Sequence, residues 1–90
     1  MIDVEKITDT SFKVTVRSTR TTTHQVTVRP AYYDKLTGGK VAIETLVKRS
    51  FEFLLERERN TDILRTFHLP VIGSYFPEYE MTIQEWLKNP

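Results

Sequence analysis

The chain has 90 residues, of which 39% are hydrophobic and 28% charged, and its formal net charge is +1. This length suits one small domain spanning residues 1–90, and the composition is that of a folded protein rather than a disordered one. The absence of cysteine excludes a disulfide scaffold, a thiolate zinc site and a cysteine nucleophile. We expect no signal peptide and no membrane span, because no apolar run approaches the roughly 20 residues that a span needs. The expected protein is therefore soluble and cytoplasmic, with no membrane partner.

Two segments near the N-terminus alternate between apolar and polar residues, which predicts half-buried strands. Residues 12–17 and 25–29 both show this period of two and are rich in β-branched side chains. The polar run at 18–23 can turn, so the two strands are expected to pair as an antiparallel hairpin. Residues 2–7 are a candidate third strand, and the sequence leaves their conformation open.

Two helices are predicted in the middle of the chain. The first is a short turn over residues 31–36, because Pro30 suits a first helical turn and the Gly38-Gly39 pair is a typical stop. The second, at about residues 41–57, is amphipathic. Phe53 lies off its apolar stripe and is expected to pack on the C-terminal segment. The stripe itself consists of Ile43, Leu46, Val47, Ser50, Phe51, Leu54 and Leu55.

Three further short helices are predicted in the C-terminal third. The first lies around residues 63–67, the second begins near Pro70 and ends before Pro77, and Thr82 with Glu85 forms a candidate capping box for the third. Strands first and helices after is the order typical of an α+β protein. We expect an antiparallel β-hairpin or three-stranded meander, covered by the central amphipathic helix and the short C-terminal helices.

No catalytic, cofactor-binding or metal-binding constellation is visible in the sequence. His24 and His68 are far apart, and neither has a partner at metal-ligand spacing. The glycine pair before Lys40 lacks the first glycine and the hydroxyl residue of a phosphate loop. Glu78 and Glu80 form an acidic pair that a solvated corner explains. We therefore expect a protein that is not an enzyme and needs no cofactor.

One stretch of the chain is locally basic. No acidic residue occurs between Asp9 and Asp34, and the hairpin strands there offer a polar face that either is simply solvated or binds an acidic protein or nucleic acid. The candidate basic binding face consists of Lys13, Arg17, Arg20, Gln25, Thr27 and Arg29.

The second hairpin strand resembles that of the ribbon-helix-helix repressors. The similar residues are Gln25-Val26-Thr27-Val28-Arg29-Pro30, followed by two predicted helices. In that family the strand pairs with the same strand of a second subunit, and its outward side chains enter the DNA major groove. The resemblance implies that Gln25, Thr27 and Arg29 read DNA. Nucleic-acid binding of this type is the alternative function, although the low net charge does not favour it.

A second resemblance covers most of the chain. It rests on the segments Leu36-Thr37-Gly38-Gly39, Phe51-Glu52-Phe53-Leu54-Leu55-Glu56-Arg57-Glu58 and Tyr75-Phe76-Pro77-Glu78-Tyr79-Glu80, which are similar to a group of small uncharacterised bacterial proteins. This similarity implies a single compact domain and no particular activity.

The C-terminal segment is rich in aromatic residues. Tyr75, Phe76, Tyr79 and Trp86 either complete the core or, where exposed, form a patch that binds a partner. We expect a non-enzymatic accessory or interaction module whose macromolecular partner is another protein. The identity of that partner and the oligomeric state do not follow from the sequence.

Overall fold

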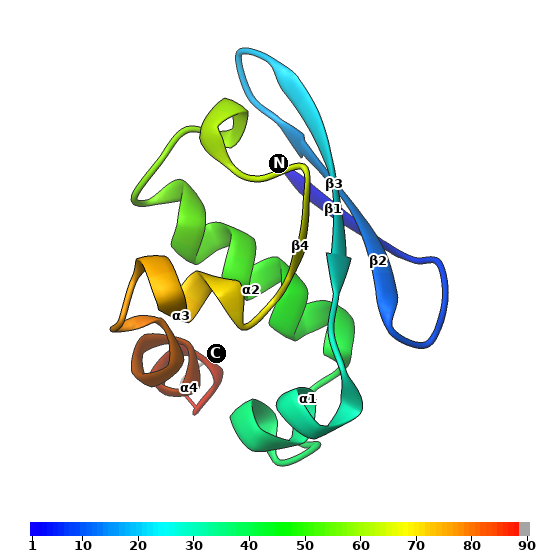
Figure 1. Ribbon diagram of the computed structural model, residues 1–90, viewed down its shortest axis with the longest axis vertical. Helices are drawn as coiled ribbons and strands as arrows, with labels where there is room; N and C mark the ends of the chain where they lie inside the picture. The colour runs from blue at the N-terminus through cyan, green and yellow to red at the C-terminus, as the bar shows by residue number, and fades with distance from the viewer. Residues whose placement is uncertain (89–90) are drawn as a thin grey trace.

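The N-terminal strands form an antiparallel meander. The computed structural model describes residues 1–88, so the last two residues of the expected domain lie outside the described part. Strand β1 (Ile2–Lys6) pairs with β2 (Ser11–Arg17), and β2 pairs with β3 (Thr21–Thr27) (Figure 1). The predicted hairpin and its third strand are confirmed. The β2–β3 turn is shorter than predicted, because the β-branched threonines at 21–23 extend β3.

A fourth strand, β4 (Thr66–His68), runs parallel to β3 and gives the sheet the order β1-β2-β3-β4. The helix predicted around residues 63–67 is therefore wrong, and helical structure nearby is limited to the 3-10 turn η1 (Asn60–Asp62). A strand of three residues has no periodicity that sequence can reveal. Its conformation is set by its tertiary partner, since Phe67 lies beside Val26 of β3.

The two predicted central helices are confirmed. Helix α1 (Pro30–Thr37) begins at Pro30 and ends at Gly38, whose positive φ of 64° glycine adopts without steric strain. Helix α2 (Ile43–Leu55) is two residues shorter at each end than predicted, and its apolar stripe faces the sheet. The residues that α2 buries are Leu46, Val47, Ser50, Phe51, Phe53 and Leu54.

Two helices, α3 (Val71–Tyr75) and α4 (Tyr79–Lys88), complete the chain that the structure describes. Helix α3 ends before Pro77 as predicted. The predicted capping box at Thr82 is wrong, because α4 begins three residues earlier. The backbone N–H of Thr82 donates to the carbonyl of Glu78 at 3.0 Å, so Thr82 lies inside the first turn instead of capping it.

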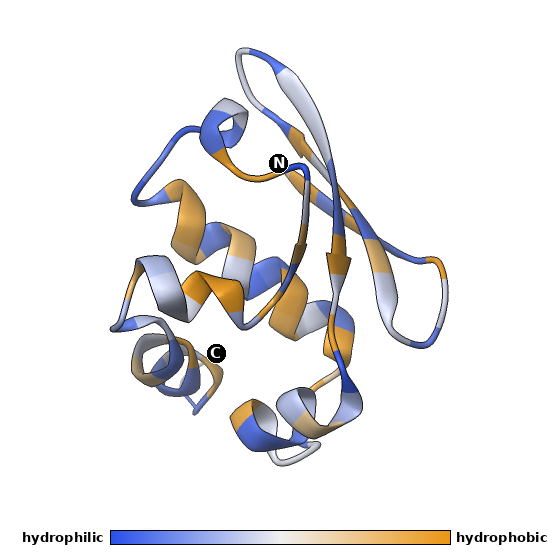
Figure 2. Ribbon diagram, viewed as in Figure 1, coloured by the Kyte–Doolittle hydropathy of each residue, from blue (hydrophilic) through white to orange (hydrophobic). Residues whose placement is uncertain are grey.

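The helices cover one face of the sheet, and the other face is exposed to solvent. Inward-facing Phe12, Val14 and Val26 are completely buried, whereas their neighbours Lys13 and Gln25 are exposed. Figure 2 shows the corresponding mixture of hydrophobic and hydrophilic segments along the strands and α2. The chain thus has the predicted α+β fold, with three strands preceding the helices and β4 lying between α2 and α3. Within residues 1–88 no helix has the length and apolar character to cross a membrane.

Candidate functional site

The residues of the predicted basic face do not form one site. Arg17 and Arg20 lie at the β2–β3 turn, whereas Thr27 and Arg29 lie at the opposite end of β3. A strand of seven residues is roughly 20 Å long, so one small ligand cannot reach both ends. The other two residues of this face lie between them on the outer surface of the sheet.

Acidic residues of β1 balance the charge of that outer surface. Lys13 pairs in register with Gln25 on one side and with Glu5 on the other. Arg17 forms an ion pair with Asp3 of β1. Sequence reasoning missed this balance, because Asp3 and Glu5 precede the locally basic stretch and reach it only through strand pairing.

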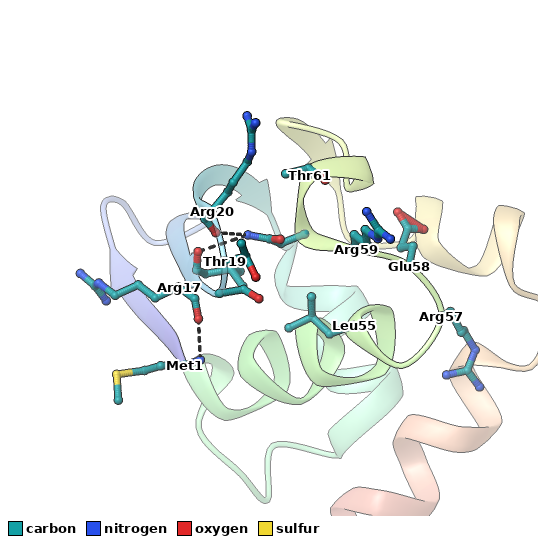
Figure 3. A pocket seen from close by; sticks show the side chains of 12 residues that line it. Met1, Arg17, Thr19, Arg20, Leu55, Arg57, Glu58, Arg59 and Thr61 are labelled. Carbon is teal, nitrogen blue, oxygen red and sulfur yellow. Dashed lines mark hydrogen bonds between the residues drawn. The ribbon is translucent and has the colours of Figure 1, made fainter.

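A cleft at the β2–β3 turn has four arginines among its lining residues, although the side chains of Arg17 and Arg57 point away from each other (Figure 3). Its volume is about 960 Å³, and it lies between that turn and the loop that joins α2 to η1. The hairpin contributes Arg17 and Arg20, and the loop contributes Arg57 and Arg59 (Figure 3). In this view Arg17 and Arg57 lie on opposite sides, with Arg59 between them. Glu58 is the one acidic residue that lines the cleft, and the ion pairs of Arg17 with Asp3 and of Arg57 with Glu78 leave Arg20 and Arg59 as the unpaired arginines.

A buried polar network holds the two walls of the cleft together. The side-chain amide of Asn60 donates to the carbonyl of Arg20 at 2.8 Å and to the hydroxyl of Thr22 at 3.0 Å. The hydroxyl of Thr22 donates in turn to Nε2 of His24, whose Nδ1–H donates to the carbonyl of Leu64, both at 2.8 Å. Burial lowers the pKa of His24, which favours this neutral form. The loop is therefore positioned by directional bonds to the hairpin.

The four arginines differ in whether other residues of the protein already bind their guanidinium groups. Nε of Arg57 donates to Glu78 at 3.0 Å, and its guanidinium lies 3.5 Å from the centre of the Phe53 ring. Arg20 and Arg59 are both exposed, and neither forms an ion pair with another residue of the described range 1–88. These two guanidinium groups are available to an anionic ligand.

The aromatic residues of the predicted partner patch belong largely to the core. Tyr79 is completely buried, so it is unavailable to a partner, and burial raises the pKa of its phenol. Phe76 and Trp86 are half-buried, and all three rings contact Phe53, with centroids 5.2 to 6.2 Å apart. The prediction that Phe53 packs on the C-terminal segment is confirmed. Only Tyr75, with 64% of its surface exposed, lies open to solvent.

The candidate catalytic side chains are not brought together. His24 faces the core, whereas His68 is exposed on the opposite face of the sheet. Glu80 accepts a hydrogen bond from the hydroxyl of Tyr32 at 2.8 Å and an ion pair from Lys35 at 3.2 Å, which together lower the pKa of Glu80 and join α4 to α1. Within the described residues, no three His, Asp or Glu side chains are grouped to hold a metal ion.

Comparison with known proteins found no relative. No family model matches the chain, and no curated protein or solved structure is significantly similar to it. The resemblance to small bacterial proteins stays a prediction. Strand β3 is paired on one side with β2 and on the other with β4. The pairing with β4 covers the edge of β3 at Gln25–Thr27, and the resemblance to ribbon-helix-helix repressors stays a prediction.

Proposed function

We propose that the protein is a cytoplasmic, non-enzymatic interaction module that binds an acidic segment of a partner protein in the arginine-rich cleft. The observation that supports this most is a pair of exposed arginines without an ion pair in residues 1–88, Arg20 from the hairpin and Arg59 from the distant loop after α2, on one cleft that a single acidic residue lines. The location in the cytoplasm rests on the cysteine-free sequence alone.

The chemistry of the cleft suits carboxylates on an extended peptide. A guanidinium group presents parallel N–H donors that match the two oxygens of a carboxylate, and such charge-assisted bonds are stronger than neutral ones. Half-buried Leu55 adds apolar surface beside the arginines. An acidic segment that also carries an apolar side chain would use both kinds of surface, as protein interfaces commonly do.

Two features favour a protein partner over nucleic acid. No aromatic residue lines the cleft, so unpaired bases would find no ring on which to stack. The adjoining outer face of the sheet carries Asp3 and Glu5 beside its basic residues, and the net charge of the chain is only +1. The carboxylates of β1 would repel the phosphates of a duplex that lay along that face.

The test uses a fluorescein-labelled pentapeptide with a central leucine flanked by two glutamates on each side. Its binding is measured by fluorescence anisotropy at low and physiological salt, for the wild type and for the double variant Arg20→Gln/Arg59→Gln. Each lost arginine–carboxylate contact is worth about 1 kcal/mol, so we expect roughly a tenfold or greater loss of affinity at low salt. Salt should weaken wild-type binding as well.

The matched control is the double variant Lys13→Gln/Lys48→Gln, which removes the same charge from exposed positions outside the cleft. It should change the affinity by less than about twofold. Equal losses in both double variants would show that only net charge matters and would contradict the proposal. Single-stranded or duplex DNA that binds more tightly than the peptide would favour the nucleic-acid alternative instead.

A further inference from the structure

An apolar pocket lies on the other side of the loop that forms the arginine-rich cleft. Its volume is about 220 Å³, and it opens between the end of α2, the strand β4 and the helix α3. Leu54, Ile63, Phe67 and Ile72 form its buried lining. At its margin lie Leu64 and Tyr75, two large apolar side chains that are 46% and 64% exposed. The pocket and its margin form a continuous apolar groove.

Two carboxylates line the same groove. Glu58 and Asp62 both border the pocket, and neither forms an ion pair within residues 1–88. Partial burial, together with the negative charge of Asp62, raises the pKa of Glu58. The groove therefore combines an apolar floor with negative charge that no cation of the described chain neutralises.

We propose that this groove is a second docking site, which binds a segment of a partner protein carrying one large apolar side chain next to lysine or arginine. The pocket is smaller than the roughly 300 to 1,000 Å³ typical of small-molecule sites, and its size suits one anchoring side chain. Cationic neighbours of that anchor would meet Glu58 and Asp62, whereas an acidic segment would be repelled.

The two docking sites have opposite charge and share a wall. Glu58 lines both the arginine-rich cleft and the acidic groove, because the loop between α2 and η1 separates them. The second site does not depend on the first: its apolar lining comes from α2, β4 and α3, and none of the four arginines lines it. A failure of either proposal can therefore be recognised separately.

The test uses a labelled pentapeptide with a central leucine flanked by two lysines on each side. Two further peptides serve as comparisons: one replaces the leucine by alanine, and the other replaces the lysines by glutamates. Anisotropy gives the affinities, and backbone amide chemical shifts give the site. We expect the lysine–leucine peptide to bind at least fivefold more tightly than the alanine peptide, and to shift the amides of Leu64, Phe67 and Tyr75.

The test variant is Leu64→Lys, which places a cation at the margin of the groove, and the matched control is Met81→Lys on α4. Both residues are exposed, so neither change should disturb folding, and Met81 does not line the groove. Leu64→Lys should weaken binding of the lysine–leucine peptide at least fivefold, and Met81→Lys should leave it within twofold. Equal binding of the alanine peptide, or equal effects of the two variants, would overturn the proposal. So would a concentration-dependent dimer, seen by sedimentation, that Leu64→Lys dissociates, because the groove's occupant would then be a second copy of this chain.

Discussion

Replacing Asn60 by alanine should destabilise the protein far more than an ordinary loop substitution. The side chain is 94% buried, and its amide has two N–H groups, which match the acceptors at 2.8 and 3.0 Å on Arg20 and Thr22. The third contact, to the carbonyl of Val16 at 3.4 Å, is too long to contribute much. The carbonyl of Arg20 keeps the N–H of Ser18 and the hydroxyl of Thr22 keeps His24, so the cost is that of two lost hydrogen bonds, about 1 to 3 kcal/mol.

Urea unfolding followed by circular dichroism measures this loss. Thr61→Ala is the matched control, because Thr61 is exposed and adjacent in the same loop. It should change the free energy of unfolding by less than about 0.5 kcal/mol. A domain of 90 residues has a stability of roughly 5 to 13 kcal/mol, so the Asn60 variant should remain folded with a clearly lower urea midpoint. A loss below about 0.5 kcal/mol for Asn60→Ala would refute the view that this amide joins the loop to the hairpin.

Two further predictions concern buried polar groups in the core. Because burial lowers the pKa of His24 below its ordinary 6.5, protonation favours the unfolded chain, and the free energy of unfolding should fall as the pH is lowered from about 6.5 through the folded-state pKa. The positive charge of Arg65 contributes to the same lowering of the pKa. Thermal unfolding measured between pH 7.5 and 5 gives the dependence of stability on pH. This dependence should disappear in His24→Gln and remain in the control His68→Gln. Tyr79→Phe removes the hydroxyl that lies 2.6 Å from that of Ser50, and it should cost about 1 kcal/mol in urea unfolding while leaving the fold unchanged. A variant as stable as the wild type would show that this bond contributes nothing.

The elements that the sequence predicted correctly either have a pattern that repeats or are bounded by proline or glycine, as α1 and α3 are. Helix α2 shows an apolar stripe over several turns, and β2 alternates over its full length. Residues 66–68 form a strand that is too short to show an alternation of apolar and polar residues. Their pairing with β3 depends on a segment some 40 residues away in the chain. Thr82 has the sequence of a helix start, but Tyr79 begins the helix earlier because its ring packs on Phe53. Tertiary packing here overrides a local capping signal.

The candidate site was predictable only in part, for the same reason. Arg17 and Arg20 stand out as basic residues beside a turn, but Arg57 and Arg59 have the appearance of an ordinary charged helix end. Their approach to the hairpin depends on Asn60, which nothing in the local sequence distinguishes from any polar loop residue. For Tyr79 the sequence left open whether the ring completes the core or joins a partner patch, because aromatic residues without a periodic context give no indication of which of them are buried.

The buried polar network explains why Arg20 and Arg59, from segments far apart in the chain, line the same cleft. Thr22, His24 and Asn60 are each less than 7% exposed, and burying such groups is unfavourable unless every one is hydrogen-bonded. Within the described residues every buried side-chain donor and acceptor has a partner, so the network is fully satisfied. Apolar contacts at the same place would attract the loop without fixing its register, because hydrophobic association is non-directional. The chain of bonds from the carbonyl of Arg20 through to that of Leu64 specifies one position for the loop, and with it the shape of the arginine-rich cleft on one side and of the acidic groove on the other.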